Sequence, residues 1–174
     1  MRWASDRCAA ADYDGAMYLD ALSFLEDERD AFRPFEALDA LTDAQLDEPV
    51  AAAGGWSGRD LMGHIAPERA LAAAKELAVN ETSESIRRLD AEWAIPGNGD
   101  RINDAALAEV RALPMAEVRR RFRETAGELR GYLTVVPEAR WVKHSTHLEW
   151  FLGETIDHYA EHEATLAAIL EAAR

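Results

Sequence analysis

The chain has 174 residues, of which 48% are hydrophobic and 30% are charged, the composition of an ordinary soluble globular protein. Its formal net charge at pH 7 is −14, and this acidic excess disfavours binding to nucleic acids and to anionic membrane surfaces, which both need a basic footprint. The length is typical of one domain with a substantial core, so we expect residues 1–13 to be an N-terminal arm and residues 14–174 to form a single domain.

The cysteine content and the distribution of apolar residues predict a cytoplasmic location. Cys8 is the only cysteine, so no disulfide can form within the chain, which favours a reducing compartment. No apolar run approaches the roughly 18 residues that a membrane-spanning helix needs. Residues 1–15 lack the apolar stretch of a signal peptide.

Helix-forming residues dominate the sequence, and the alternating β-branched runs typical of strands are scarce. The first predicted helix covers residues 14–40, and Pro34 should kink or interrupt it because proline removes a backbone donor and clashes with the preceding turn. A short helical turn is expected at Asp43–Asp47. The second long helix begins after Ser57, which forms a pattern typical of a capping box with Asp60 three residues later.

A proline also lies within this second helix. Pro67 removes the backbone hydrogen bond to the carbonyl of Gly63, so the helix should bend next to His64. Residues 80–113 are the least regular part of the chain, and we expect short helices there. The remaining predicted elements are short helices at 83–93 and 103–113 with a loop at 95–100 between them, a third long helix from Pro114 to the residue before Pro137, a loop at 138–147, and a last long helix from 148 or 153 to 173. Four long amphipathic segments with helical links predict an all-α four-helix bundle.

Three histidines on two predicted helices form a candidate metal site. His158 and His162 are four residues apart, so they share one helix face with Cβ atoms roughly 5–6 Å apart. His64 lies on the buried stripe of the second helix. A third imidazole from another helix would complete a three-histidine site with open positions, which is typical of a catalytic metal. The alternative is that each imidazole is a hydrogen-bonded core residue, because such spacing also occurs without a metal.

Other residues could also contribute to this site. Glu68 lies one turn after His64 and is expected on the same buried stripe, where it could accept a hydrogen bond from an imidazole N–H, act as a fourth ligand, or form a salt bridge. His144 and His147 are expected to be exposed loop residues, with a place in the pocket as the alternative. Trp56 is expected to serve the core.

Several motifs resemble the DinB-like (YfiT-like) superfamily in their order and spacing. Gly-Trp-Ser-x-Arg-Asp-x-x-x-His at residues 55–64 is similar to the start of the second helix in that superfamily, and His-Tyr-x-Glu-His at residues 158–162 is similar to its closing motif. The segment 41–49 resembles its lead-in, and Asn103 followed by residues 113–118 resembles the approach to its third helix. The similarity extends over residues 14–172.

The resemblance implies an up-down-down-up four-helix bundle in which three histidines bind a divalent metal, commonly nickel or zinc. By motif position these are His64, His158 and His162. Several members are dimers, so a homodimer is expected. Characterised relatives include mycothiol-dependent maleylpyruvate isomerase and bacillithiol S-transferase, which implies a low-molecular-weight thiol as a second cofactor. A coordinated thiol is readily deprotonated, and its thiolate would attack an electrophilic small-molecule substrate.

Three functions stay open at this point. The protein could be a metal-dependent thiol S-transferase or a related small-molecule enzyme. It could instead be a metal-binding, stress-associated bundle protein without catalysis, or a helical protein that dimerises and uses its histidines as core residues. An enzyme would need an accessible cavity beside the metal.

Overall fold

The computed structural model describes residues 18–174, and this part of the chain is all-helical, without strands, which confirms the predicted all-α class. The α-helices are α1 (Ala21–Phe32), α2 (Asp43–Asp47), α3 (Gly58–Ile65), α4 (Glu68–Val79), α5 (Glu84–Trp93), α6 (Asn98–Ala112), α7 (Met115–Val135), α8 (Ser145–Glu154) and α9 (Ile156–Ala172). The 3-10 segments are η1 (Arg33–Ala40), η2 (Ala51–Ala53) and η3 (Glu138–Arg140). The predicted arm at residues 1–13 and the start of the first predicted helix at residues 14–17 lie outside the described residues. Within them, each helix is too short or too polar to cross a membrane.

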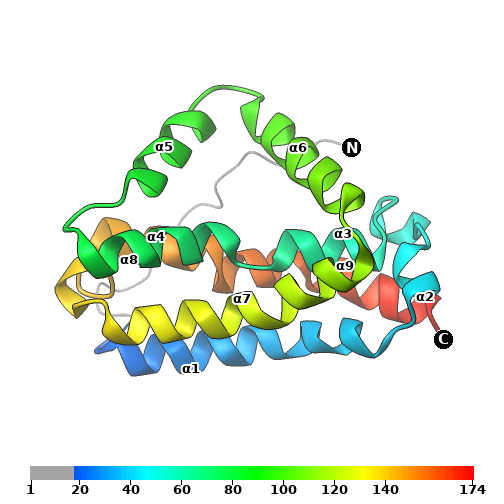
Figure 1. Cartoon of the computed structure of the whole chain (residues 1–174), viewed down its shortest axis with the longest axis horizontal. Helices are drawn as coiled ribbons and strands as arrows, with labels where there is room; N and C mark the ends of the chain where they lie inside the picture. Colours follow the sequence, from blue (N-terminus) through cyan, green and yellow to red (C-terminus); the bar gives the residue numbers. More distant parts are fainter. Residues whose placement is uncertain (1–17) are drawn as a thin grey trace.

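The segments that lie along the long axis of the molecule are α1 with η1, α3 with α4, α7, and α8 with α9 (Figure 1). The first and last of these segments run in one direction along the axis, and the other two run in the opposite direction. α4 packs on α7, and both α1 and α3 pack on α9. α5 and α6 leave the long segments and form an arch beside α4 and α3, with which they remain in contact (Figure 1).

Side-chain caps define where two of the early helices begin. The Thr42 hydroxyl accepts from the backbone N–H of Gln45 at the start of α2, and the Gln45 side chain accepts from the backbone of Thr42 in return. The predicted capping box of Ser57 and Asp60 is present at the start of α3. These contacts satisfy backbone donors that have no partner within a helix, so the helix start is fixed by local sequence.

Both internal prolines interrupt their helices, as predicted. At Pro34 the α-helical α1 gives way to the 3-10 segment η1. At Pro67 the effect is larger than a bend, because Ala66 takes an extended conformation with ψ 122° and the helix restarts as α4. The residue before a proline is pushed out of the α region by the proline ring, which explains the extended Ala66.

The last long helix is also interrupted, and no proline predicts it. Thr155, with φ −133° and ψ −96°, separates α8 from α9. Its hydroxyl donates to the carbonyl of Phe151 at 2.5 Å, a side-chain bond that competes with the helical backbone pattern. Both interruptions therefore lie within three residues of a candidate metal ligand, His64 in one case and His158 in the other.

Two predicted loops are partly helical. α6 begins at Asn98, inside the predicted loop at residues 95–100, because Gly97 takes the left-handed conformation with φ 75° and the Asn98 side chain donates to the carbonyl of Glu92. α8 begins at Ser145, inside the predicted loop at residues 138–147. In both places a local contact accompanies the early helix start, from Asn98 to the Glu92 carbonyl in one case and from the His147 N–H to His144 in the other.

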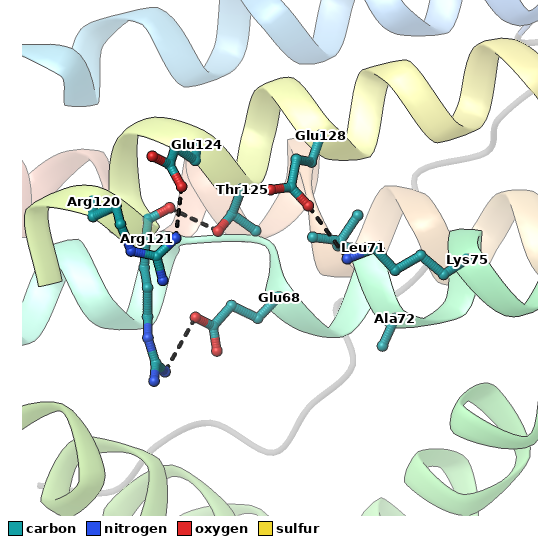
Figure 2. A pocket seen from close by; sticks show the side chains of 9 residues that line it. All are labelled: Glu68, Leu71, Ala72, Lys75, Arg120, Arg121, Glu124, Thr125 and Glu128. Carbon is teal, nitrogen blue, oxygen red and sulfur yellow. Dashed lines mark hydrogen bonds and ion pairs between the residues drawn. The ribbon is translucent and has the colours of Figure 1, made fainter. Parts of the chain in front are cut away.

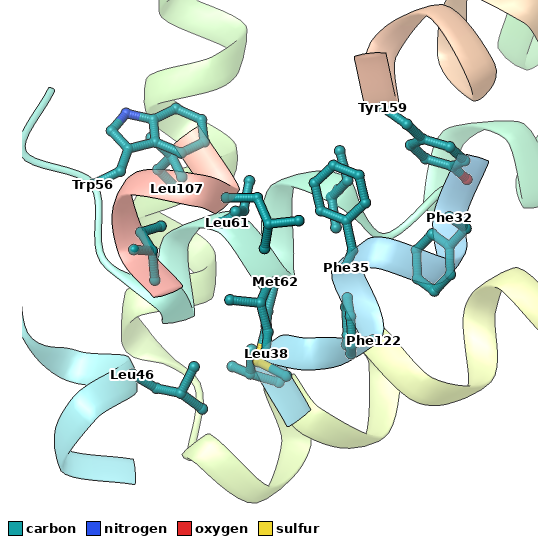
Figure 3. Packing of buried hydrophobic residues seen from close by; sticks show 14 of the residues in the cluster. Phe32, Phe35, Leu38, Leu46, Trp56, Leu61, Met62, Leu107, Phe122 and Tyr159 are labelled. Carbon is teal, nitrogen blue, oxygen red and sulfur yellow. The ribbon is translucent and has the colours of Figure 1, made fainter. Parts of the chain in front are cut away.

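The core that supports the candidate site is rich in aromatic residues (Figure 3). The ring of Phe32 lies 5.4 Å from the rings of both Phe122 and Tyr159, centroid to centroid. Full burial of one such ring stabilises the fold by about 1.5–3 kcal/mol. The same cluster contains Leu61 and Met62 of α3, so it fixes the two helices that carry the candidate histidines.

Candidate metal centre

His64, His158 and His162, the histidine triad, come from two helices that meet beside the core. His64 is the penultimate residue of α3, and its neighbour Ile65 is fully buried. His158 and His162 lie in the first two turns of α9, on either side of the buried Tyr159. Because α3 packs on α9, the burial of these apolar neighbours points the imidazoles toward one another.

The structure brings together the three residues selected from the sequence. Nε2 of His64 lies 2.9 Å from Nε2 of His158 and 3.0 Å from Nε2 of His162. One potential ligand atom from each of the three lies within 4.8 Å of the others. The rings meet edge to face, with planes at 76° to 78°, so that ring edges converge on one point.

The environment of the triad keeps its imidazoles neutral. Burial lowers the pKa of His64 to about 2, and the neighbouring His158, His162 and Arg69 add to this effect. Burial also lowers the pKa of His158 to about 3 and that of His162 to about 4. A neutral imidazole has one nitrogen lone pair, and this is the form that binds a metal.

This donor set fits a divalent metal ion. Metal–nitrogen bonds of about 2.0–2.1 Å place neighbouring ligand nitrogens roughly 2.9–3.4 Å apart, and the two measured separations lie in that range. A single N–H on Nε2 of His64 could donate a hydrogen bond to only one of the two nitrogens that face it, from His158 or from His162. A cation at the common point would interact with all three nitrogens. Three protein ligands also leave coordination positions open, as in catalytic sites.

Trp56 forms one wall of the site. Its indole stacks on His162 and meets the ring of His64 edge to face, with centroids 5.5 and 4.8 Å apart respectively. Trp56 directly precedes the capping residue Ser57, so the start of α3 determines where the indole lies. The sequence assigned Trp56 to the core, to which it belongs (Figure 3), but its contact with two triad histidines was not predicted.

A buried ionic network connects α9 with α1 and α7. The hydroxyl of Tyr159 donates to Oε1 of Glu28 at 2.9 Å, and Nε of Arg130 donates to Oε2 of Glu28 at 2.5 Å. Glu28 is completely buried. Burial raises the pKa of Glu28, and the contacts with Arg130 and Tyr159 act in the opposite direction. The network holds the residue next to His158 in place, and sequence patterning did not reveal it.

The comparison with known families agrees with these observations. A family model described as the mycothiol maleylpyruvate isomerase N-terminal domain matches residues 25–150. The chain belongs to this family. The family is a DinB-like superfamily domain, so the resemblance seen in the sequence motifs is confirmed. The matched segment contains His64 and ends before His158 and His162. No curated protein and no solved structure matches the chain.

In this member of the mycothiol maleylpyruvate isomerase N-terminal domain family, Glu68 does not lie beside the triad as the sequence suggested. Its side chain is 49% exposed and pairs with Arg121 at 3.4 Å. The expectation of a buried position is wrong because the break at Pro67 changes the rotation of α4 relative to α3. Of the three roles considered for Glu68, the structure supports the salt bridge.

The other two histidines of this family member form a pair away from the triad. His144 caps the N-terminus of α8 by accepting from the backbone N–H of His147, and their rings stack with centroids 4.0 Å apart. His144 is exposed as expected. His147 is buried, and its Nδ1 lies 2.5 Å from the carbonyl of Arg140, so the expectation of an exposed loop residue is wrong for His147. The reason is the extra helical turn at the start of α8, which turns this side chain inward.

An open groove of about 350 Å³ lies between α4 and α7, and it contains none of the triad (Figure 2). Its charged side chains are paired with one another: Lys75 with Glu128 at 3.2 Å, and Arg120 with Glu124 at 2.6 Å. Each charged side chain that lines the groove therefore has a partner of opposite charge, Glu68 with Arg121 included. Within the triad, His64 and His158 are half-buried and His162 is buried, so the first two are its more accessible members.

Proposed function

We propose that this protein is a divalent-metal-dependent enzyme that transfers a low-molecular-weight thiol to an electrophilic small molecule. The observation that carries the proposal is the convergence of three neutral imidazole nitrogens on one point. Nickel or zinc is the proposed ion, because both accept imidazole ligands. Family membership supports the use of a thiol, since the family is described by a mycothiol-dependent isomerase.

The residues of the chain have separate parts in this proposal. A divalent ion supplies, when bound, the positive charge that lowers the pKa of a coordinated thiol. His64, His158 and His162 hold three nitrogen atoms in position, and their low pKa values prevent protons from competing at neutral pH. Trp56 covers His162 and limits the access of water to that side of the site. His64 and His158 are only half-buried, so a ligand would reach the ion from their side of the triad.

We extend the proposal to the helix arrangement and the assembly. The long segments form the up-down-down-up four-helix bundle of the superfamily, which their directions along the long axis support (Figure 1). The active form is a cytoplasmic homodimer. Light scattering of the purified protein, combined with size-exclusion chromatography, tests the dimer.

The decisive experiment measures metal content and thiol conjugation together. We expect elemental analysis to find about one nickel or zinc ion per chain, and we expect metal-loaded protein to conjugate a thiol to an electrophile faster than the metal-free protein does. A His144→Gln variant is the matched control, because His144 is an exposed histidine outside the triad. It should keep both the metal and the activity.

The same experiment decides between catalysis and metal storage. Stoichiometric metal without conjugation of any of several thiols would favour the non-catalytic, stress-associated metal-binding protein. The absence of metal from protein grown with nickel and zinc would contradict both functions and favour histidines that serve only the core.

A further inference from the structure

Helix α6 is attached to the short helix α3, which carries His64. Arg111 of α6 donates two hydrogen bonds of 2.8 Å to the carboxylate of Asp60 in α3. Arg59 of α3 donates to the backbone carbonyl of Leu113, at the end of α6, at 2.7 Å. The C-terminal part of α6 is therefore held against the first turn of α3, one turn before the candidate metal ligand.

The two helices approach closely at Gly63, the residue before His64. A β-carbon added to Gly63 would lie 2.4 and 2.5 Å from the two γ-carbons of Val110 and 3.0 Å from its Cβ. Ordinary van der Waals contact begins at 3.4 Å, so any side chain at this position would overlap with Val110. Val110 cannot turn away, because a β-branched side chain has one strongly preferred rotamer in a helix. The close packing of α6 on α3 thus depends on glycine at position 63.

Other helical glycines of the protein have no such contact. A β-carbon added to Gly127 or to Gly131 in α7 would meet no atom within 4 Å. Glycine weakens a helix relative to alanine, so it is unfavourable for the helix itself at all three positions. Only at Gly63, among these three, does the packing of a second helix require the absence of a side chain.

The position of His64 depends on such contacts because α3 is not continuous with α4. α3 has eight residues and ends at the extended Ala66, after which the chain restarts as a new helix. Nε2 of His64 lies 2.9 and 3.0 Å from the other two triad nitrogens, and metal–ligand distances tolerate deviations of only about 0.2 Å. A side chain at position 63 would separate α3 from α6 by roughly the difference between 2.4 and 3.4 Å, which is well beyond that tolerance.

We infer that α6 positions His64 for metal binding, and that the packing of Val110 on Gly63 is the central contact. Neither residue touches the metal, so both are positioning residues that determine where Nε2 of His64 lies. The inference rests on the proposed function in one respect, namely that the triad binds a divalent metal. It gives a role in the metal site to the arch of α5 and α6, which lies outside the four long segments (Figure 1).

The test is a double-variant cycle on Gly63 and Val110 in which zinc affinity is measured by competition with a chromogenic chelator. We expect Gly63→Ala to bind zinc about 10-fold to 100-fold more weakly than the wild type, the usual effect of losing the support of a metal ligand. Val110→Ala removes the two nearest carbon atoms and leaves the contacts of Arg111 and Arg59 with α3 and α6 in place. The double variant should therefore bind zinc within about threefold of Val110→Ala.

Two controls separate this role from a general effect on folding. Gly127→Ala makes the same substitution in open space, so it should raise the melting temperature and leave zinc affinity unchanged. Leu77→Ala removes a fully buried side chain from the other core cluster, so it should lower the melting temperature and again leave zinc affinity unchanged. Wild-type affinity in Gly63→Ala, a double variant that regains none of it, or an equal loss in Leu77→Ala would each overturn the inference.

A further variant loosens α6 at a different contact and decides the question if Gly63→Ala does not fold. Arg111→Lys keeps a positive charge beside Asp60 but cannot form two parallel hydrogen bonds to its carboxylate. It should also weaken zinc binding, though less than Gly63→Ala. If Gly63→Ala does not fold, wild-type zinc affinity in Arg111→Lys overturns the inference.

Failure of the proposed function would look different. Zinc affinity is measured without a thiol, so the absence of thiol conjugation contradicts thiol transfer and leaves this test intact. If the wild type binds neither zinc nor nickel, the imidazole proton signals of His64 in the metal-free protein decide. The indole of Trp56 lies 4.8 Å from the His64 ring, centroid to centroid, so its ring current makes these signals sensitive to the position of His64. Gly63→Ala should shift them and the double variant should restore them, whereas unchanged signals in Gly63→Ala would overturn the inference.

Discussion

The indole of Trp56 lies nearly parallel to the ring of His162, with only 22° between the two planes, and this contact closes the triad on one side. His162 is 4% exposed and Trp56 is 9% exposed, so together they form the most buried part of the site. The triad is thus asymmetric, with one imidazole inside the core and two at its edge. Because of this asymmetry, we expect substitutions on the buried side to change metal affinity and substitutions on the accessible side to change ligand access.

Replacing Trp56 should change both the core and the pKa of His162. We expect Trp56→Ala to destabilise the protein by about 3–5 kcal/mol, the usual cost of removing a large buried aromatic side chain. It should also raise the pKa of His162 toward 6.5, because burial is what lowers it. Metal release on acidification should then begin at a higher pH. Urea unfolding and metal retention against pH measure the two effects. Trp56→Phe is the conservative control, and a release profile that is the same in all three proteins would contradict this role.

Loss of one triad ligand should remove the metal and leave the fold intact. In His162→Gln we expect most of the metal affinity to disappear, because one of three protein ligands is lost. The metal-free variant should stay within about 2 kcal/mol of the metal-free wild type, since the aromatic core supplies the stability. Elemental analysis and thermal unfolding of both proteins provide the measurement. A collapse of stability that accompanies metal loss would instead indicate a structural metal.

The stability of the metal-free protein should decrease between pH 6.5 and pH 4. The unfolded chain has imidazoles with a pKa of about 6.5, whereas the folded triad has values of about 2, 3 and 4. Below pH 6.5 the unfolded state therefore binds protons that the folded state does not, and acidification favours unfolding. Carboxylates with lowered pKa, such as that of Asp60, contribute to acid unfolding mainly below this window.

Urea unfolding in the presence of a chelator, at intervals from pH 7.5 to pH 4.5, measures this dependence. A variant with all three triad histidines replaced by glutamine should have a flatter profile in that window. The same slope in the variant and the wild type would show that other groups cause it.

Much of the fold was predictable from sequence because it depends on local sequence features that span only a few residues. The capping box at Ser57, the interruption at Pro34 and the spacing of His158 and His162 all depend on neighbouring residues, and all are present. The rotation of α4 was not predictable, because it depends on how far the chain turns at Ala66 before the helix restarts. The sequence prediction extended the helical periodicity across this break, and for that reason it placed Glu68 on the wrong face.

The sequence pattern did not predict those contacts near the site whose two residues are distant in the sequence. Nothing around Glu28 marks it as buried, because its partners Arg130 and Tyr159 are more than 100 residues away. The helix break at Thr155 is likewise not marked by a proline in the sequence. The position of Glu154 just before this break, and hence its pairing with Arg69, could not be inferred. Burial of a charged residue can be read from sequence only when its partner is nearby on the same helix.

The network of Glu28, Arg130 and Tyr159 should be the most sensitive polar feature of the core. Glu28→Ala leaves a largely buried guanidinium and a buried hydroxyl without their acceptor, so we expect a loss of about 3–5 kcal/mol in the free energy of unfolding. Tyr159→Phe removes only one hydrogen bond and should cost about 0.5–1.5 kcal/mol. Urea unfolding of both variants tests this order.

The double variant Glu28→Met with Arg130→Met determines whether the penalty comes from the charge that is left behind. It removes both ionic groups and keeps their apolar volume, so it should be less destabilising than Glu28→Ala alone. A double variant that is as unstable as the sum of the two single methionine variants would show that the residues do not interact. Metal content of the double variant gives a second readout, because Tyr159 directly follows His158 in α9. We expect weaker metal binding there, since α9 loses one of its contacts with α1, the hydrogen bond from Tyr159 to Glu28.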